Sequence, residues 1–243
     1  MDHTNNSCCC GEAEYFSGCL ICGAPITYRA ESSIQTCSIC HKEQLTNAVC
    51  ENGHFICDAC HSYGTYAPVI TTLRDSTEKD ALLLLEKIMD LPSVHMHGPE
   101  HHAIVPCVLL TAFRNNGEHM DYDAALSEIC KRAKQVPGGT CGYWGVCGAA
   151  AGAGIFMSVM TGSSPLYKDA WPFPQKLVSI ILSRLADVGG PRCCKRTSRI
   201  AIEEAVHFYS QFCSVNIPLS SITCKYCEDN RECIQEDCPY YSE

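Results

Sequence analysis

The sequence lacks the segments that would export or anchor a protein. Its first residues, Met1-Asp2-His3-Thr4, form neither a basic nor an apolar stretch, so we expect no secretory signal. The most apolar window, residues 145–162, is short and rich in Gly and Ala, which is typical of a tightly packed buried helix and not of a membrane span. We therefore expect a cytoplasmic protein that does not interact with membranes.

Basic runs and nucleotide-binding loops are also missing. The net charge is −9, and the run Arg192-Cys193-Cys194-Lys195-Arg196 is too short to form a basic stripe on a protein surface. Three glycines at 148, 152 and 154 lie inside a predicted helix instead of following a strand, as a nucleotide-binding loop would. These absences argue against nucleic acid as a partner and against a nucleotide cofactor.

Cysteine, in contrast, is abundant, with 21 in 243 residues. A reducing compartment does not accumulate disulfides, so most of these side chains are expected as thiolates on metal and a few as free thiols. So many thiols also suit an anaerobic cell. The run Cys8-Cys9-Cys10 has no ligand spacing and is predicted to be a tail.

Composition divides the chain into three parts, and the predicted fold class is mainly α. Residues 1–65 form a small zinc-binding module, residues 66–215 a helical bundle that carries cysteines, and residues 216–243 a cysteine-rich metal-binding tail. Apolar periodicity and turn residues in the middle part predict six helices, with Ser76 as the N-cap of the first. These helices are expected at 80–89, 100–114, 122–134, 146–160, 174–186 and 198–212.

The N-terminal module contains enough ligands for two four-coordinate zinc ions. The two residues within each Cys-x-x-Cys pair allow a tight turn that directs both sulfurs to one ion. The ligands are Cys19, Cys22, Cys37, Cys40, Cys50, His54, Cys57 and Cys60. Ligation is either sequential, with the first four on one ion, or cross-braced, with alternate pairs sharing an ion. A segment this short needs metal to fold, and its filled ions would be structural.

The module is similar to known zinc fingers. Residues 50–60, with the order Cys, Gly-His, Cys and Cys, resemble a segment of RING-like fingers, and the order of the pairs resembles PHD or FYVE fingers. We carry neither ubiquitin ligation nor histone reading over to this chain. His61, next to Cys60, is expected to be an ordinary surface residue.

The helical part places several thiols in unusual surroundings. Cys147 is expected to begin a helix, where unpaired N–H groups and the helix dipole favour a thiolate. Gly148 and Gly152 share one face of that helix, where another backbone could approach closely. The basic residues around Cys193 and Cys194 are expected to lower a thiol pKa. Two adjacent cysteines rarely face one ion, so at most one should be a ligand of a given metal.

This pattern resembles the redox-active family named for the motif C…GCAxxG…C…C. The first cysteine corresponds to Cys107, the second element to Cys147-Gly148-Ala149-Ala150-Ala151-Gly152, and the later cysteines to Cys193 or Cys194 and Cys213. The resemblance implies an iron–sulfur cluster or cycling thiols. We expect Cys107, Cys141, Cys147 and Cys193 to be the cofactor ligands. Cys141 and the doubled cysteine depart from the family pattern.

The whole chain also looks like a family of unknown function in anaerobic bacteria and archaea. The hallmarks are the segments at 97–102, 137–142 and 189–196. The resemblance implies redox partners or companions of the radical-SAM and methyltransferase type. The sequence carries no signal for an oligomeric state.

Histidines gather before the helix that carries Cys107, at positions 95, 97, 101 and 102. His97 and His101 are four residues apart and could share a helix face as metal ligands or proton-transfer groups, with Glu100 orienting a neighbour. An equally good interpretation is a helix start, with Pro99 in the first turn and the histidines capping or half-buried.

The tail contains Cys224-x-x-Cys227, Cys233 and Cys238-Pro239, which is a strong metal signal. Zinc and a [4Fe–4S] cluster both accept four thiolates, so a structural staple and an electron carrier are equally expected.

The sequence thus predicts a metal-binding, redox-active protein that transfers electrons or sulfur. The residues expected to carry the chemistry are Cys141, Cys147, Cys193, Cys194, His97 and His101. One alternative is a zinc-stabilised interaction or assembly protein without redox chemistry. The other is a sulfur- or methyl-transferring enzyme that uses an activated thiolate.

Overall fold

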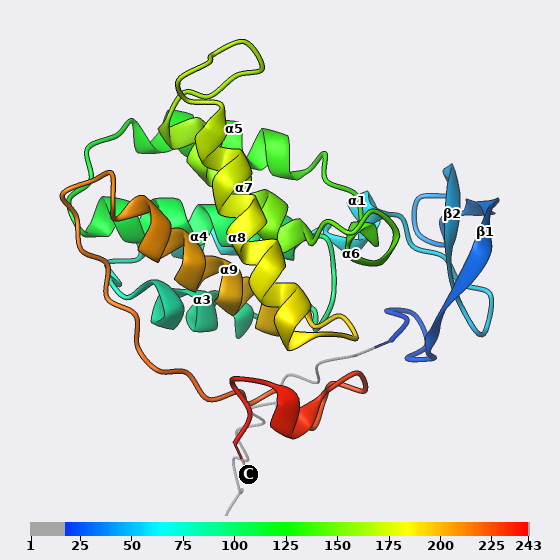
Figure 1. Cartoon of the computed structure of the whole chain (residues 1–243). Coiled ribbons are helices and arrows are strands. Elements are labelled where there is room, and N and C mark those ends of the chain that lie inside the picture. Colours follow the sequence, from blue (N-terminus) through cyan, green and yellow to red (C-terminus); the bar gives the residue numbers. More distant parts are fainter. Residues whose placement is uncertain (1–17, 243) are drawn as a thin grey trace, which may run out of the picture.

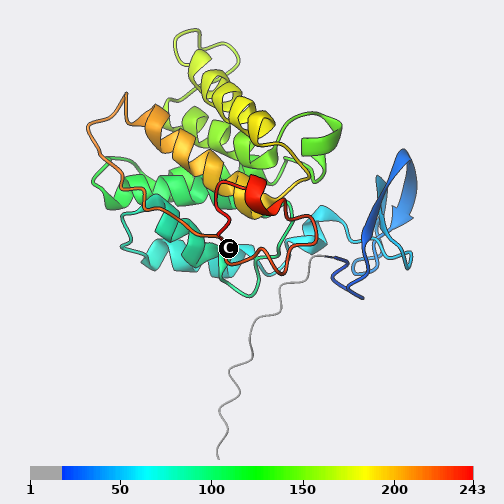
Figure 2. The same cartoon turned by 60° about the horizontal axis from the view of Figure 1, so that its bottom comes forward.

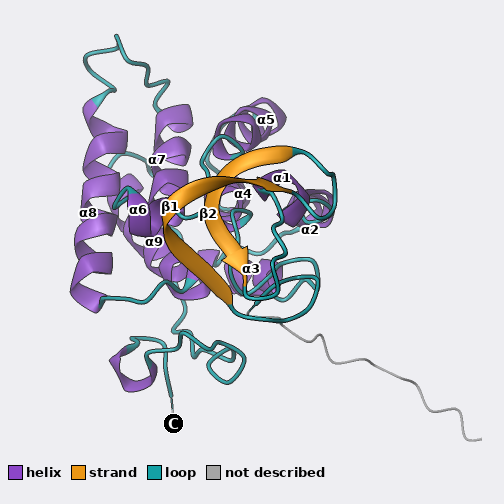
Figure 3. Ribbon diagram, turned by 90° about the vertical axis from the view of Figure 1, so that its right-hand side faces the viewer, coloured by secondary structure: helices purple, strands orange, loops and turns teal. Residues whose placement is uncertain are grey.

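The protein consists of a helical bundle with a small β-hairpin module at one side (Figure 1). The computed structural model describes residues 18–242, and the run Cys8-Cys9-Cys10 lies outside them. In the module, strands β1 (Ile26–Thr36) and β2 (Glu43–Cys50) pair antiparallel, from Ile26 opposite Cys50 to Thr36 opposite Glu43. Figure 3, which views the molecule from the module's side, shows both strands crossing in front of the helices.

The helices follow in chain order from the end of the module. They are α1 (Asp58–His61), α2 (Tyr66–Asp75), α3 (Ala81–Met89), α4 (His101–Asn115), α5 (Tyr122–Ala133), α6 (Thr140–Tyr143), α7 (Gly148–Met160), α8 (Pro172–Val188) and α9 (Cys194–Tyr209), with a short 3₁₀ turn at Gln235–Asp237. None of the helices in the described part of the chain is long and apolar enough to cross a membrane.

Helix α4 is the centre of the bundle. Its residues from His101 to Phe113 are all buried, and it packs against α2, α3, α5, α7 and α9. A helix that is apolar on every side needs such complete enclosure, since any uncovered face would expose hydrocarbon to water. The aromatic rings of Phe113, Phe156 and Tyr209 join α4, α7 and α9 in one core, with ring centroids 4.8–5.5 Å apart.

Glycines allow α7 to lie unusually close to α4. A Cβ atom on Gly152 would come within 2.5 Å of the His102 carbonyl oxygen, and one on Gly148 would meet the His102 ring. The close backbone approach predicted for this glycine face is therefore confirmed. It brings the start of α7, where Cys147 is the N-cap, against the start of α4.

The tail folds back over the bundle instead of extending from it, as Figure 2 shows (red). The Tyr226 hydroxyl donates to Asp90 after α3, and the Tyr240 hydroxyl donates to Glu203 on α9. The Ser220 N–H donates to the Asp80 carboxylate at 2.7 Å. Residues far apart in the chain thereby hold the two ends of the helical part together.

The predicted fold class, mainly α with a small cysteine-rich module, is confirmed, and each of the six expected helices has its counterpart. The first N-cap differs from the prediction: Asp80 and not Ser76 accepts the N–H groups of Leu82 and Leu83. A carboxylate one residue before the helix reaches these donors directly. Neither α2 nor the hairpin was predicted from the sequence.

The close packing of α7 leads to a stability prediction. Gly152→Ala should destabilise the protein by about 1–3 kcal/mol, because the added methyl group collides with backbone that cannot move away. Gly142→Ala is the matched control: its Cβ would meet nothing within 4 Å, so it should change stability by less than about 0.5 kcal/mol. Urea unfolding followed by circular dichroism measures both, and equal effects would contradict the packing described.

Candidate metal centres and a thiol cleft

The first metal centre is formed by donors from both ends of the module. The Nδ1 atom of His54 lies 3.3 Å from the Cys22 sulfur, 3.5 Å from that of Cys50 and 3.8 Å from that of Cys19. All four ligand atoms lie within 4.8 Å of one another. Cys19 and Cys22 precede β1, Cys50 ends β2 and His54 follows it, so pairing of the strands brings the two halves together.

The second centre lies at the other end of the hairpin and has four sulfurs, from Cys37, Cys40, Cys57 and Cys60. The sulfurs of Cys40 and Cys57 are 3.8 Å apart, and the Cys57 N–H donates to the Cys37 sulfur. Alternate pairs along the chain thus share a centre. The donors are grouped in the cross-braced order and not in the sequential one.

Neighbouring thiols in these centres have opposite pKa shifts. Backbone and Asn52 N–H groups lower the pKa of Cys22 to about 6. In the second centre, burial and neighbouring sulfurs raise the pKa of Cys60 to about 12, whereas backbone N–H groups outweigh burial at Cys37 and lower its pKa to about 6. Four crowded thiols cannot all ionise without a cation among them, and a bound metal would remove this conflict.

The module contacts the helical bundle through a few polar residues. The Asp58 carboxylate on α1 accepts the Gly138 N–H at 2.7 Å. The Arg192 side chain donates to the Tyr28 hydroxyl and lies over its ring, and the Tyr28 ring is 6.1 Å from that of Tyr143. Between these contacts lies a cleft of about 1040 Å³ with walls from both parts.

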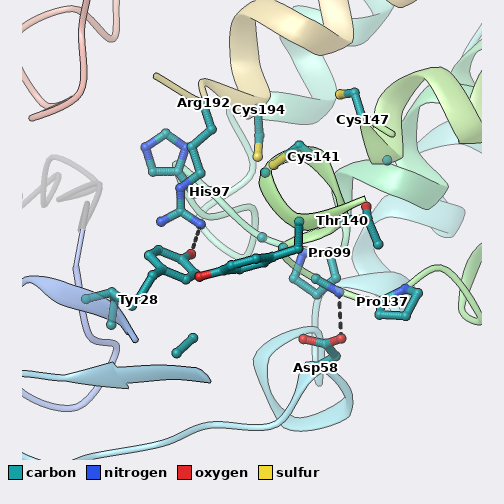
Figure 4. A pocket seen from close by; sticks show the side chains of 18 of the residues that line it. Tyr28, Asp58, His97, Pro99, Pro137, Thr140, Cys141, Cys147, Arg192 and Cys194 are labelled. Carbon is teal, nitrogen blue, oxygen red and sulfur yellow. Dashed lines mark hydrogen bonds between the residues drawn. The ribbon is translucent and has the colours of Figure 1, made fainter. Parts of the chain in front are cut away.

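Three cysteines present their sulfurs to this cleft (Figure 4). Cys141 lies on α6, Cys147 at the start of α7 and Cys194 at the start of α9. The charge of Cys141 acts on Cys147, and that of Cys147 on Cys194. The structure therefore brings together three of the four cysteines expected to carry the chemistry, although their sulfurs are not among the described groups that gather within 4.8 Å.

Two of these thiols, Cys147 and Cys194, are less acidic than predicted. Burial raises the pKa of Cys147 and outweighs the N–H groups of Ala149 and Ala150 at the helix start. Burial likewise raises the pKa of Cys194 to about 12, despite the nearby charge of Arg192. The expectation of a thiolate stabilised by the helix dipole and basic neighbours is wrong, because loss of hydration is the larger effect in a half-buried site.

Cys193 also borders the cleft, but its sulfur has different neighbours. It accepts the Arg196 N–H at 3.4 Å, and the charges of Cys224 and Cys238 act on it. Adjacent cysteines thus face different partners, as expected for such a pair. The four tail cysteines are all half-buried, and their sulfurs form no group within 4.8 Å among the described residues.

Cys107 requires a correction. The resemblance placed it with the cofactor ligands Cys141, Cys147 and Cys193, but it is buried in the core and does not line the cleft. Its sulfur lies 3.7 Å from that of Cys130 on α5, and this neighbour together with burial raises its pKa well above the usual range. The turns of α4 that cover the cleft carry histidine, and Cys107 lies on a later turn.

His97 and His101, which were expected to act as a pair, share no hydrogen-bond partner among the described residues. His97 contacts Asn230 and Glu232 of the tail at 3.0 and 3.1 Å through Nε2. His101 contacts the His95 carbonyl oxygen, and burial lowers its pKa to about 3. Both border the cleft, but their imidazoles have different partners, because His97 precedes α4 instead of sharing a helix face with His101.

A third group of possible metal ligands was not predicted from the sequence. It consists of His61, His95 and Glu100, whose ligand atoms lie within 4.8 Å of one another. His61 is therefore not the ordinary surface residue that was expected. The three come from separate segments with no common spacing, so no sequence motif connects them.

One protein family matches the chain. The pattern of a family described as "Family of unknown function (DUF5714)" matches residues 69–241, which covers the helical part and the tail. No curated protein and no solved structure matches the sequence or the fold.

The cross-braced order can be tested with ¹¹³Cd-substituted protein. We expect one cadmium signal coupled to protons of Cys19, Cys22, Cys50 and His54, and another coupled to the remaining four cysteines. Cys60→Ser should shift only the four-sulfur signal. In the sequential order, protons of Cys50 and Cys60 would couple to the same cadmium, and Cys60→Ser would shift the signal of the centre that contains His54.

Proposed function

The chain belongs to DUF5714, a family of unknown function, and we propose that it is a redox protein whose cleft thiols hold an iron–sulfur cluster for electron or sulfur transfer. The observation that carries this proposal is the convergence of Cys141, Cys147 and Cys194 on one cleft from three separate helices.

The raised pKa values favour a bound cofactor over a free nucleophile. A thiolate-dependent enzyme needs a sulfur that ionises near neutral pH, whereas burial raises the pKa of Cys147 and of Cys194. A cationic cofactor reverses this balance, since a coordinated thiol loses its proton outright. The same burial that suppresses free thiolate chemistry at Cys147 and Cys194 would shield that side of a cluster from water, whereas Cys141 is exposed.

A single zinc ion would need the cleft sulfurs to lie closer together than they do in the described residues. Around one zinc ion, sulfurs 2.3 Å from the metal lie about 3.8 Å apart, as the sulfurs of the module do. The cleft sulfurs are not gathered to that degree among the described residues. A cluster of several irons holds its cysteines farther apart, and three cysteines leave one iron open to a small ligand in the cleft.

In this proposal the two module centres hold zinc and are structural. Each offers four protein ligands, so no position is left for a substrate. The module contributes Tyr28 and Asp58 to the cleft, and its zinc ions support catalysis only by holding that wall in place. Cysteines that bind metal as thiolates are typical of a reducing cytoplasm, and we propose that the protein is located there.

The cleft rim suggests how a partner would exchange electrons with the cluster. Tyr143 and Trp144 lie two and three residues after Cys141 and are exposed, which gives the rim an apolar, aromatic edge. Aromatic residues of this kind are enriched in protein interfaces. We propose a redox or radical-SAM-type protein as the partner that supplies or removes single electrons here.

Iron analysis of anaerobically purified protein tests the proposal. The wild type should contain iron and acid-labile sulfide and absorb visible light, whereas Cys147→Ser should lose most of both. Cys213→Ser is the control, because this half-buried cysteine lies outside the cleft and contacts only Val215 among the described hydrogen-bond partners. Protein that contains zinc alone, or iron that survives Cys147→Ser, would refute the cleft cluster.

A second candidate function, docking through the zinc module, rests on the hairpin surface. Ile34 and Leu45 are opposite each other in the β1–β2 register, and both are about two-thirds exposed, at 67% and 66%. If this apolar pair docks a partner, Leu45→Glu should abolish partner binding while the iron content stays unchanged. If the cleft holds a cluster, Cys147→Ser should instead lose iron while partner binding through the hairpin stays unchanged.

A further inference from the structure

A buried carboxylate lies between two histidines at the junction of the module and the bundle. Glu100 precedes α4 and is fully buried, with no exposed surface. Its Oε1 atom is 2.9 Å from His95 Nδ1, and its Oε2 atom is 3.3 Å from His61 Nδ1. The two imidazole rings meet edge to face, with centroids 4.7 Å apart. The three side chains come from α1, from the loop after α3 and from the start of α4.

The surrounding backbone fixes this carboxylate in place. The His95 N–H donates to Oε1 at 3.2 Å. Gly98 lies so close that a Cβ atom there would be 2.1 Å from Oε2, and only glycine leaves room for the side chain. Burial would raise the pKa of Glu100, but the two imidazoles outweigh it and hold the pKa well below its usual range. The loop therefore holds an anion in the interior.

One side of this carboxylate has an incomplete set of contacts. Among the described atoms, Glu100 Oε2 and His61 Nδ1 are buried without an aligned hydrogen-bond partner, although they are near each other. A buried anion is costly unless hydrogen bonds or a cation compensate for it. Lys195 donates to the Met89 carbonyl oxygen at 3.0 Å, and the charge of Glu100 also acts on it. A metal ion between these donors would compensate the anion.

The neighbouring histidines have partners other than Glu100. His102 contacts the Val136 carbonyl oxygen, as His101 contacts that of His95, so both use backbone oxygens. His97 is turned to the tail. Among these histidines, His61 and His95 aim a ring nitrogen at the same carboxylate, and the three ligand atoms gather as in a metal centre with two histidines and one carboxylate.

From this geometry we propose that His61, His95 and Glu100 bind one divalent first-row transition ion, Zn²⁺ or Fe²⁺, separately from the module centres and the thiol cleft. With metal–ligand bonds of about 2.1 Å, neighbouring donors lie about 3.0–3.4 Å apart. The observed 2.9 Å from His95 to Oε1 and 3.3 Å from His61 to Oε2 are close to that range, and the ligand atoms of the three residues lie within 4.8 Å of one another. The donor set of two nitrogens and one oxygen suits such borderline ions better than Ca²⁺ or Mg²⁺.

Three protein ligands leave the ion open to another molecule. The side chains of His61 and His95 are 20% and 24% exposed, so both rings reach the surface, although the donor atoms His61 Nδ1 and Glu100 Oε2 are themselves buried. His61 also lines the cleft that holds the thiols. Open coordination distinguishes a site for substrate or water from the closed tetrads of the module. A ligand in the cleft could therefore reach this ion as well as the proposed cluster.

Cobalt binding to the full chain tests the site. In protein whose module centres already hold zinc, added Co²⁺ should bind once more per chain and give weak ligand-field bands without the intense sulfur-to-cobalt charge-transfer absorption. His95→Ala and Glu100→Gln should each weaken this binding about tenfold or more. His119→Ala, which removes an exposed histidine outside the group, should leave it unchanged.

Two outcomes would overturn the proposal. Equal Co²⁺ affinity of wild type and His95→Ala, or bound cobalt that always shows sulfur charge transfer, would leave the trio as a hydrogen-bonded network. If Glu100→Gln fails to fold, the half-buried His95 carries the test, with zinc content and circular dichroism as folding controls. The iron content of the same samples is measured separately, so loss of the thiol cluster is distinguishable from loss of this site.

Discussion

The cross-braced grouping of eight ligands is the constraint on which the rest of the molecule depends. The module has almost no hydrophobic core: its buried cluster consists of Cys37, Phe55 and Cys57. Metal ligation therefore has to supply the free energy that apolar burial supplies elsewhere. Because alternate pairs share a centre, neither end of the hairpin can fold alone. The ordered hairpin and α1 then provide one wall of the cleft.

The opposite wall depends on a second constraint, the close approach of α7 to α4. Gly148 and Gly152 permit this approach, and it fixes where Cys147 emerges. The same packing removes water from the sulfur, which is why its pKa rises although it caps a helix. Burial and helix dipole thus oppose each other, and the larger desolvation effect favours cation binding over free thiolate chemistry.

The parts predictable from sequence are those governed by local rules. Apolar periodicity located the six long helices, and the Cys-x-x-Cys spacing located the module ligands. Tertiary contacts decided the rest. The sequence left cross-bracing open, because both orders satisfy the same local turns. Cys107 shares a motif position with cleft residues, yet it lies deeper along α4, where it meets Cys130. His61 and His95 meet only through the packing of the module on the bundle.

The central claim is that zinc shapes the module while iron occupies the thiol cleft. Crystals of anaerobically purified protein, measured at the zinc and iron absorption edges, test it most directly. The account predicts zinc anomalous peaks within both module tetrads and an iron peak bordered by the sulfurs of Cys141, Cys147 and Cys194. A cleft without an iron peak, in crystals whose tetrads hold zinc, would contradict it.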